Sequence, residues 1–390
     1  MHDNDRPSKP KVALILTGGG ARAAYQVGVL RAIAELLPPQ QVRTVFPVIC
    51  GTSAGAINAA VMAAGAADFR RGVRRLMTVW KNFHVHHVYR SDPLGVIRNS
   101  GRWTLAALSG GAMAGDPVSL LDNSPLAALL ERYLDFPAIQ RSIDSGDLDA
   151  LSVTCSGYTS GQSVTFFQGR PQLQPWQRAR RLGVAMPIET RHLLASSALP
   201  FIFPPVRINR EYFGDGSMRQ IAPVSPALHL GADRLLVIGV GRQLQHQSER
   251  VKTDAHPSLA QIAGHALNSI FLDSLEVDLE RLQRINRTIE IIPQEILRKT
   301  AYPLRRVDFR LLAPSLELEK IAIEHAGELP RTIRILLHTV GGLRQSGSNL
   351  LSYVLFEKSY CRALIQLGYR DTMARGQDLL AFLGCESVSA

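Results

Sequence analysis

A single serine stands between two glycines in the pentapeptide Gly-Thr-Ser-Ala-Gly, which ends at Gly55. Residues 42–50 before it are rich in branched and aromatic side chains that favour a strand, whereas residues 54–64 are small and favour a helix. A sharp strand-to-helix turn strains the turn residue, and Gly51 and Gly55 leave the room that it needs. Ser53 would then lie at the positive end of a helix dipole. The pattern predicts a nucleophile elbow, and a plain strand-to-helix turn built from the same residues stays open as an interpretation.

A serine nucleophile needs donors for the oxyanion that forms on attack, and a glycine run offers them. The run follows a predicted strand over residues 12–16 and opens a predicted helix, so its N–H groups can face outward. Its members are Gly18, Gly19 and Gly20, with the positive charge of Arg22 nearby. A tight turn or a dinucleotide loop of the form G-x-G-x-x-A are the other interpretations. A dinucleotide fold requires an acidic residue at the end of the next strand, where this chain has the Ser53 elbow instead.

The serine hydroxyl also needs a base, and the sequence offers an aspartate and a histidine cluster. Asp215 ends a predicted strand in the run YFGDGS, at the edge where open α/β sheets gather their sites. Taken alone, its Asp-Gly dipeptide is a common turn. His84, His86 and His87 lie in a weakly periodic segment where histidines are commonly surface residues, and no carboxylate pattern orients them. We therefore expect Asp215 to be the base.

Together these three elements resemble the motifs of the patatin-like phospholipases. The resemblance covers about residues 12–240 and includes the flanking segments SALPFIFPPV and GADRLLVIGV. It implies a modified α/β-hydrolase fold with three layers around a mostly parallel sheet, and a Ser-Asp dyad that works without histidine. By this resemblance Ser53 is the nucleophile, Asp215 is the base, Gly216 belongs to the dyad loop, and the loop from Gly18 to Arg22 is the oxyanion hole.

One position departs from the family pattern. The family usually has Gly or Ala after Asp-Gly, and this chain has Ser217. A serine is small enough to fit, and it could add a hydrogen bond to Asp215 and lower the basicity of that carboxylate. Asp215 can act as a base only if partial burial keeps its proton affinity above that of a solvated aspartate. The reaction requires no cofactor, and the sequence offers no metal-ligand cluster.

Composition and charge bound the class of protein. The chain has 390 residues, of which 46% are hydrophobic and 20% charged, as in ordinary soluble globular proteins. Its net charge of +11 favours anionic surfaces such as phospholipid head groups. Nucleic acid is disfavoured as a partner because no groove-reading or stacking motif accompanies the charge. Two arginine clusters, either solvated faces or contacts to an anionic membrane, contribute to it: Arg70, Arg71, Arg74 and Arg75, and the run at residues 178–181.

The cysteines and the N-terminus favour a cytoplasmic protein with the option of peripheral membrane contact. The four cysteines are far apart and lack Cys-x-x-Cys spacing, so neither a disulfide framework nor a zinc site is expected. The first apolar run is only as long as a strand, too short for a signal sequence or a membrane span.

We expect three parts in the chain. A polar tail covers residues 1–10, a catalytic domain covers 11–242 with a lid-like segment at 83–117, and a mostly helical extension covers 243–390 and packs on the core. The α/β core is expected to close near Gly241, and the later run RTIEIIP reads as a strand of the extension.

The predicted function is a serine-dependent lipid acyl hydrolase of the phospholipase A or lysophospholipase type, which cleaves carboxylic esters through an acyl-enzyme. Two alternatives stay open: a lipid-binding or regulatory module with a vestigial dyad, and a carboxylesterase for soluble esters. The sequence leaves the head group, the acyl-chain length and the oligomeric state undetermined.

Overall fold

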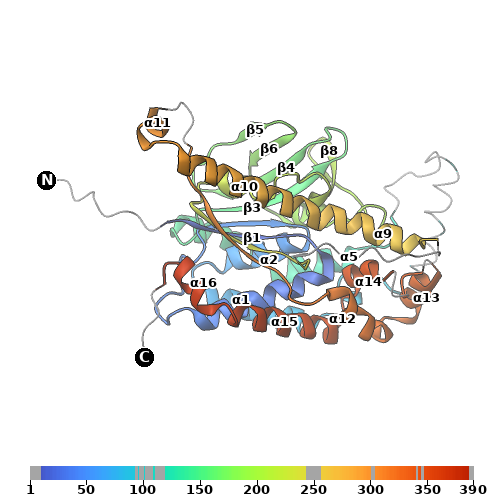
Figure 1. Ribbon diagram of the computed structural model, residues 1–390. Helices are drawn as coiled ribbons and strands as arrows, with labels where there is room; N and C mark the ends of the chain where they lie inside the picture. The colour runs from blue at the N-terminus through green and yellow to red at the C-terminus, as the bar shows by residue number, and fades with distance from the viewer. Residues whose placement is uncertain are drawn as a thin grey trace.

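A computed structural model gives the fold of the chain (Figure 1). It describes residues 10–92, 95, 101, 109, 119–242, 256–299, 304–339, 341–343 and 347–385. The predicted polar tail lies outside these residues except for Pro10. In the described part, a ten-stranded sheet runs through the molecule and carries helices on both faces.

The sheet is parallel through its centre. Its strands are, in chain order, β1 (Val12–Leu16), β2 (Val48–Thr52), β3 (Ala150–Gly157), β4 (Ser163–Gly169), β5 (Trp176–Arg178), β6 (Arg181–Ala185), β7 (Val206–Ile208), β8 (Glu211–Asp215), β9 (Arg234–Ile238) and β10 (Asp308–Leu312). Their order across the sheet is β10-β9-β1-β2-β3-β4-β6-β5, with β8 attached to β3 and β7 to β8. Neighbours from β10 to β3 are parallel, whereas β4 and β8 run antiparallel to β3. The mostly parallel sheet predicted from the sequence is confirmed.

Helices cover both faces of the sheet. They are α1 (Ala24–Leu36), α2 (Ala54–Ala64), α3 (Phe69–Trp80), α5 (Ser124–Tyr133), α6 (Phe136–Asp144), α7 (Thr190–Ser196), α8 (Ser225–His229), α9 (Leu259–Asn268), α10 (Ser274–Ile291), α11 (Gln294–Lys299), α12 (Leu318–Glu324), α13 (Arg331–Thr339), α14 (Ser348–Val354), α15 (Lys358–Met373) and α16 (Gly376–Phe382). Short turns are η1 (Gly20–Ala23), η2 (Val85–His87), η3 (Gly216–Met218), η5 (Ala326–Glu328) and the π-helical turn η4 (Ser269–Asp273), which joins α9 to α10. None of the helices described is long and apolar enough to cross a membrane.

The C-terminal region packs directly on the N-terminal half of the chain. α15 lies along α1, where Tyr25 donates to Asp371 at 3.1 Å and Tyr369 donates to Glu35 at 2.9 Å. Figure 1 shows α9 and α10 crossing the opposite face of the sheet as one long rod. Segments of the C-terminal region therefore cover both faces of the sheet, as a packed extension requires.

The expectation that the α/β core closes near Gly241 is wrong. β10, which lies well beyond that point, adds to the outer edge of β9 in parallel register, with Phe309 opposite Leu235. The strand mixes charged and apolar residues because it is an edge strand and only partly buried, so its sequence lacks the continuous apolar run of the central strands. The sheet and the C-terminal region thus form one folded unit.

The prediction of a strand for the run RTIEIIP is also wrong. Residues 287–291 of this run form the last turns of α10. Ile289 is buried there and extends the apolar stripe of the helix. Packing of this stripe on the sheet outweighs the strand preference of the branched residues. The other buried apolar residues of the stripe are Leu275, Leu279 and Leu282.

The beginning of the lid-like segment is part of the packed interior. Phe83, Val85 and Tyr89 are buried around η2, and the Tyr89 hydroxyl donates to the Val354 carbonyl at 3.0 Å. Weak periodicity here therefore reflects a tightly packed irregular segment rather than a loose loop. The remainder of the predicted lid lies outside the described residues apart from positions 95, 101 and 109.

Candidate active site

Strands β2 and β8 approach the same edge of β3 from opposite directions. β2 runs parallel to β3 and ends at Thr52, opposite Thr154. β8 runs antiparallel and ends at Asp215, opposite Cys155, the next residue of β3. The ends of the two strands therefore meet, and Ser53, the residue after β2, lies close enough to Asp215 for its hydroxyl to affect the pKa of that carboxyl. The sheet register brings together the two residues that the sequence predicted as a pair.

Ser53 occupies a strained turn between β2 and α2. Its φ is 55° and its ψ is −133°, a conformation that L-residues rarely adopt. A Cβ at Gly55 would lie 2.3 Å from the Leu16 carbonyl oxygen, so the start of α2 can approach the end of β1 only with glycine there. The Ser53 N–H donates to Ser196 Oγ at 2.9 Å, and Ser196 Oγ donates to the Thr154 carbonyl at 2.6 Å. Ser196 therefore ties the strained elbow to β3.

Asp215 is fully buried at the start of η3. Its Oδ1 accepts the Ser217 N–H at 2.9 Å, and its own N–H donates to the Ala198 carbonyl at 2.9 Å. Burial raises the pKa of Asp215 to about 6, against the lowering effect of the Ser53 hydroxyl and of Ser217. Ser217 thus has the pKa-lowering influence that its sequence position suggested.

One oxygen of Asp215 is free to take a proton. Oδ2 is buried and has no hydrogen-bond partner of ordinary geometry among the described residues. The Ser53 hydroxyl lies close enough to act on this carboxyl as a hydrogen-bonding group, and it lowers the pKa of Asp215. A buried carboxylate with a raised pKa and a free oxygen has the properties of a general base.

The glycine loop before α1 lies beside the elbow. Gly20 has a φ of 54°, and a Cβ there would lie 2.2 Å from the Tyr353 carbonyl oxygen, so only glycine fits. In the part of the chain that the structure describes, the N–H groups of Gly18 and Gly19 donate to no other group. Free backbone donors next to a serine are what an oxyanion requires.

The Arg22 side chain turns away from the serine and into the C-terminal region. It is 1% exposed, and its Nε donates to Ser352 Oγ at 2.8 Å. Its guanidinium also donates to Asn349 at 3.1 Å, lies 3.6 Å from a Glu319 oxygen and stacks 4.2 Å from the centre of the Tyr353 ring. Arg22 therefore fixes the glycine loop to α14 and α12 instead of presenting its charge beside Ser53.

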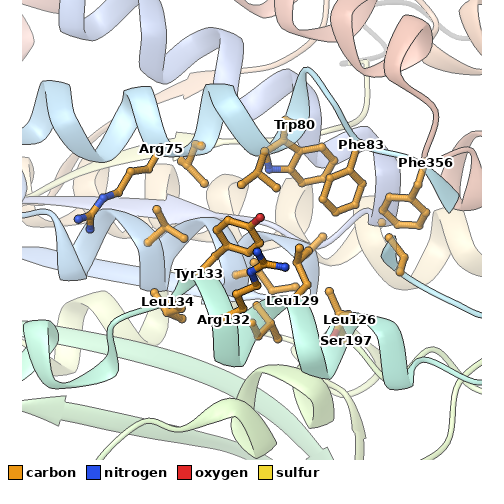
Figure 2. Close-up of a pocket in the computed structure, with 18 of the residues that line it drawn as sticks. Arg75, Trp80, Phe83, Leu126, Leu129, Arg132, Tyr133, Leu134, Ser197 and Phe356 are labelled. Carbon is orange, nitrogen blue, oxygen red and sulfur yellow. The ribbon is translucent and has the colours of Figure 1, made fainter. Parts of the chain in front are cut away.

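A cavity of about 350 Å³ extends from Ser53 between α2, α3 and α5 (Figure 2). Ser53, Gly20 and Ser197 are at its inner end. Most of its wall is aliphatic or aromatic, and Figure 2 shows side chains from α3 and α5 facing one another across it. The wall includes Ile57, Val61, Trp80, Phe83, Leu126 and Phe356. Such a lining suits a hydrocarbon chain and leaves Ser53 as a polar group at its end.

The histidine cluster does not line this cavity. His84 Nδ1 lies 2.7 Å from Glu357 Oε2, and the rings of His86 and His87 are 4.3 Å apart. The expectation that no carboxylate orients the cluster is wrong for His84, because Glu357 lies far away in sequence and reaches it only in the fold. Burial and the adjacent His86 and His84 lower the pKa of His87.

In the described residues, no group of three or more histidine, cysteine or acidic side chains could hold a metal ion. The four cysteines are buried, and none of them forms a disulfide.

Comparison with known proteins adds a family to this geometry. The model of the family described as patatin-like phospholipase matches residues 14–228, more than half of the chain. The chain belongs to the patatin-like phospholipase family. This match includes Ser53 and Asp215, so the matched region contains the ends of both β2 and β8.

Solved structures similar to this patatin-like protein include one human phospholipase A2, in two structures, and a bacterial protein. Human GIVD cytosolic phospholipase A2 is 13% identical with a TM-score of 0.43, over 98% of this chain and 61% of that chain. Its complex with methyl gamma-linolenyl fluorophosphonate is 14% identical with a TM-score of 0.41, over 96% and 59%. VipD from Legionella pneumophila is 13% identical with a TM-score of 0.34, over 95% and 67%. This chain therefore spans about three fifths of the human enzyme's length, and none of the curated proteins matches it in sequence.

Sequence reasoning missed the residues that hold this patatin-like site from outside its motifs. Ser196 supports the elbow, and Phe271 and Tyr353 enclose the glycine loop, where a Cβ on Gly18 would meet the Phe271 ring at 2.6 Å. Trp80 donates to Asn58 at 2.9 Å and forms part of the cavity wall. Ser196 immediately precedes the segment SALPFIFPPV that the sequence marked as flanking the aspartate, whereas Phe271 and Tyr353 lie in helices without a local signal.

Proposed function

We propose that this patatin-like protein hydrolyses carboxylic esters of lipids, with Ser53 as the nucleophile and Asp215 as the base. One observation supports the proposal above all others. Ser53 sits on a strained elbow at the inner end of an apolar cavity, next to a buried carboxyl whose pKa is raised to about 6. A structural serine needs neither the strain nor the unpaired carboxylate oxygen, whereas a nucleophile benefits from both.

The reaction would proceed in two halves. Ser53 Oγ attacks the acyl carbonyl while its proton passes to Asp215 Oδ2, and the N–H groups of the Gly18 to Gly20 loop donate to the oxyanion. The carbon–oxygen bond to the alcohol then breaks, and the alcohol leaves with the proton from Asp215. Asp215 next takes a proton from water, whose oxygen attacks the acyl-enzyme. Collapse of this second oxyanion releases the fatty acid and returns the proton to Ser53. No cofactor enters any of these steps.

The cavity would bind the acyl chain of the substrate. Burying hydrocarbon against the lining residues is favourable because it removes apolar surface from water. The polar part of the lipid would stay outside this apolar wall. We therefore infer a phospholipase A or lysophospholipase type of substrate, and the net charge of +11 would favour approach to anionic lipid surfaces.

Turnover of a substrate panel tests the proposal. Phospholipids, lysophospholipids and nitrophenyl esters are offered to the wild type and to the Ser53→Ala and Asp215→Asn variants. We expect turnover by the wild type and its loss in both variants, with unchanged thermal unfolding for Ser53→Ala. The variant with His84, His86 and His87 all changed to glutamine is the control and should keep substantial activity. Binding of lipid without turnover by the wild type would instead support a lipid-binding module.

A further inference from the structure

The cavity follows one face of α2 outward from the nucleophile. Ser53, Ile57 and Val61 line it, at successive spacings of four residues that place their side chains on one side of a helix. At 1.5 Å per residue, the eight positions from Ser53 to Val61 span about 12 Å. Each of these side chains of α2 therefore lies a known distance along the cavity from Ser53.

Helix α3 runs antiparallel to α2 and closes the cavity at the same levels. Trp80 donates to Asn58 at 2.9 Å, which places the end of α3 near the inner half of α2. Toward the other end, a Cβ at Gly72 would lie 3.2 Å from the Met62 methyl. Leu76, one helical turn before Trp80, therefore lies across from Val61, and both line the cavity.

The cavity has an open rim near this level. Figure 2 shows Arg75 and Leu134 at the end of the cavity opposite Ser197 and Phe356, and Arg75, the residue before Leu76, is exposed. Exposed residues elsewhere along the lining are Thr78, Arg132, Tyr133 and Asp135. Methylene groups that pass this rim reach water and gain no further burial.

Two independent estimates give the same capacity. An extended chain advances about 1.2 Å per bond, as the polypeptide does over its three bonds per residue, so about 12 Å accommodates about ten bonds. The cavity volume of about 350 Å³ holds about twelve groups of the size of a water molecule, at about 30 Å³ each. Length and volume thus both correspond to a medium acyl chain.

We propose that this cavity selects substrates by the length of their acyl chain and buries medium chains of about ten to twelve carbons in full. Val61, with Leu76 opposite, sets the greatest chain length that can be buried. The inference rests on the proposed ester hydrolysis and adds the length preference of the acyl group. Val61 acts by contact with the far end of the chain and leaves the reacting carbonyl to Ser53.

A series of nitrophenyl esters with acyl chains from about four to sixteen carbons tests the measurement. In the wild type, kcat/KM should rise by up to about fourfold per methylene and become level beyond about ten to twelve carbons. Val61→Phe should move this break to shorter chains. Ile57→Phe acts one turn from Ser53, at about 6 Å, and should move the break to about five or six carbons. Arg71→Trp adds a ring system larger than phenyl on the exposed face of α3, outside the cavity, and should leave the chain length at which kcat/KM becomes level unchanged.

The outcomes separate this inference from the function on which it rests. Absence of Ser53-dependent turnover with every ester would contradict the proposed function. Turnover that depends on Ser53 but shows no break, or the same break in wild type, Val61→Phe and Ile57→Phe, would overturn the length limit alone. If Val61→Phe fails to fold, Leu76→Phe narrows the same level from α3 and must shift the break in the same direction.

Discussion

The raised pKa of Asp215 makes a sharp prediction for the pH dependence of turnover. A base works only when ionised, so activity must be lost as pH falls through the pKa of the free enzyme. With a pKa of about 6, the ionised fraction of Asp215 falls from about 91% at pH 7 to about 9% at pH 5, a tenfold loss in kcat/KM. With the ordinary value of 3.8, about 94% would still be ionised at pH 5 and almost nothing would be lost.

The assay is kcat/KM for a neutral soluble ester between about pH 4.5 and 8, with buffers of constant ionic strength. Ser217→Ala removes a hydroxyl that lowers the pKa of Asp215, so its midpoint should move to higher pH. Histidines also titrate near this range, and the triple glutamine variant of His84, His86 and His87 serves as the control, with an unchanged midpoint expected. Burial lowers the pKa of His192 to about 4, which is too low to produce the midpoint.

Two results would refute this reasoning. A flat profile down to pH 5 would mean that the base is not the buried carboxyl. A midpoint that disappears in the triple histidine variant would assign the titration to the histidine cluster.

The raised pKa of Asp215 affects folding stability in the opposite direction from activity. The carboxyl binds its proton more tightly in the folded protein than in the unfolded chain. Its contribution to stability is therefore present below about pH 4 and is lost as pH rises through about 6.

Three further predictions concern the residues that hold the site. Ser196→Ala removes two hydrogen bonds at the elbow and should lower the free energy of unfolding by about 1–3 kcal/mol in a urea titration, with a loss in kcat larger than any change in KM. Arg22→Met removes the hydrogen bonds to the buried Ser352 and the partly buried Asn349 and should lower the free energy of unfolding by roughly 1–3 kcal/mol in the same titration, whereas an unchanged stability would contradict its anchoring role. A chain shortened to residues 1–241 loses β10 and α15 and should be insoluble, whereas a monodisperse product with full esterase activity by size-exclusion chromatography and assay would contradict the packing described.

The sequence predicted the candidate catalytic residues better than the residues that hold them in place, because the catalytic motifs depend on local chemistry. Strand, turn and helix preferences are strong around Ser53, where the glycines and the small residues of α2 agree on one geometry. The position of Asp215 at a strand end was predicted in the same way. The ends of β2 and β8 meet along β3 because of the strand order and register of the sheet, which no local sequence pattern encodes.

The C-terminal region was harder to predict because its elements are specified by tertiary packing. β10 is a short edge strand with a charged residue at its centre, so it lacks the apolar run that marks β1. Ile289 and its neighbours favour a strand locally but lie on the buried stripe of α10. Arg22 illustrates the same limit at the site, since the sequence indicated its charge near the glycine loop but gave no sign of its partners in α12 and α14.

Covalent labelling of the nucleophile tests the central claim most directly. A fluorophosphonate probe is incubated with the wild type, Ser53→Ala and Asp215→Asn, and the products are measured by intact mass and by peptide mapping. We expect one adduct on Ser53 in the wild type, none in Ser53→Ala and much slower labelling in Asp215→Asn, because the probe reacts only with an activated hydroxyl. An adduct on another residue that persists in Ser53→Ala, or no adduct in the wild type, would contradict the assignment of Ser53 as the nucleophile.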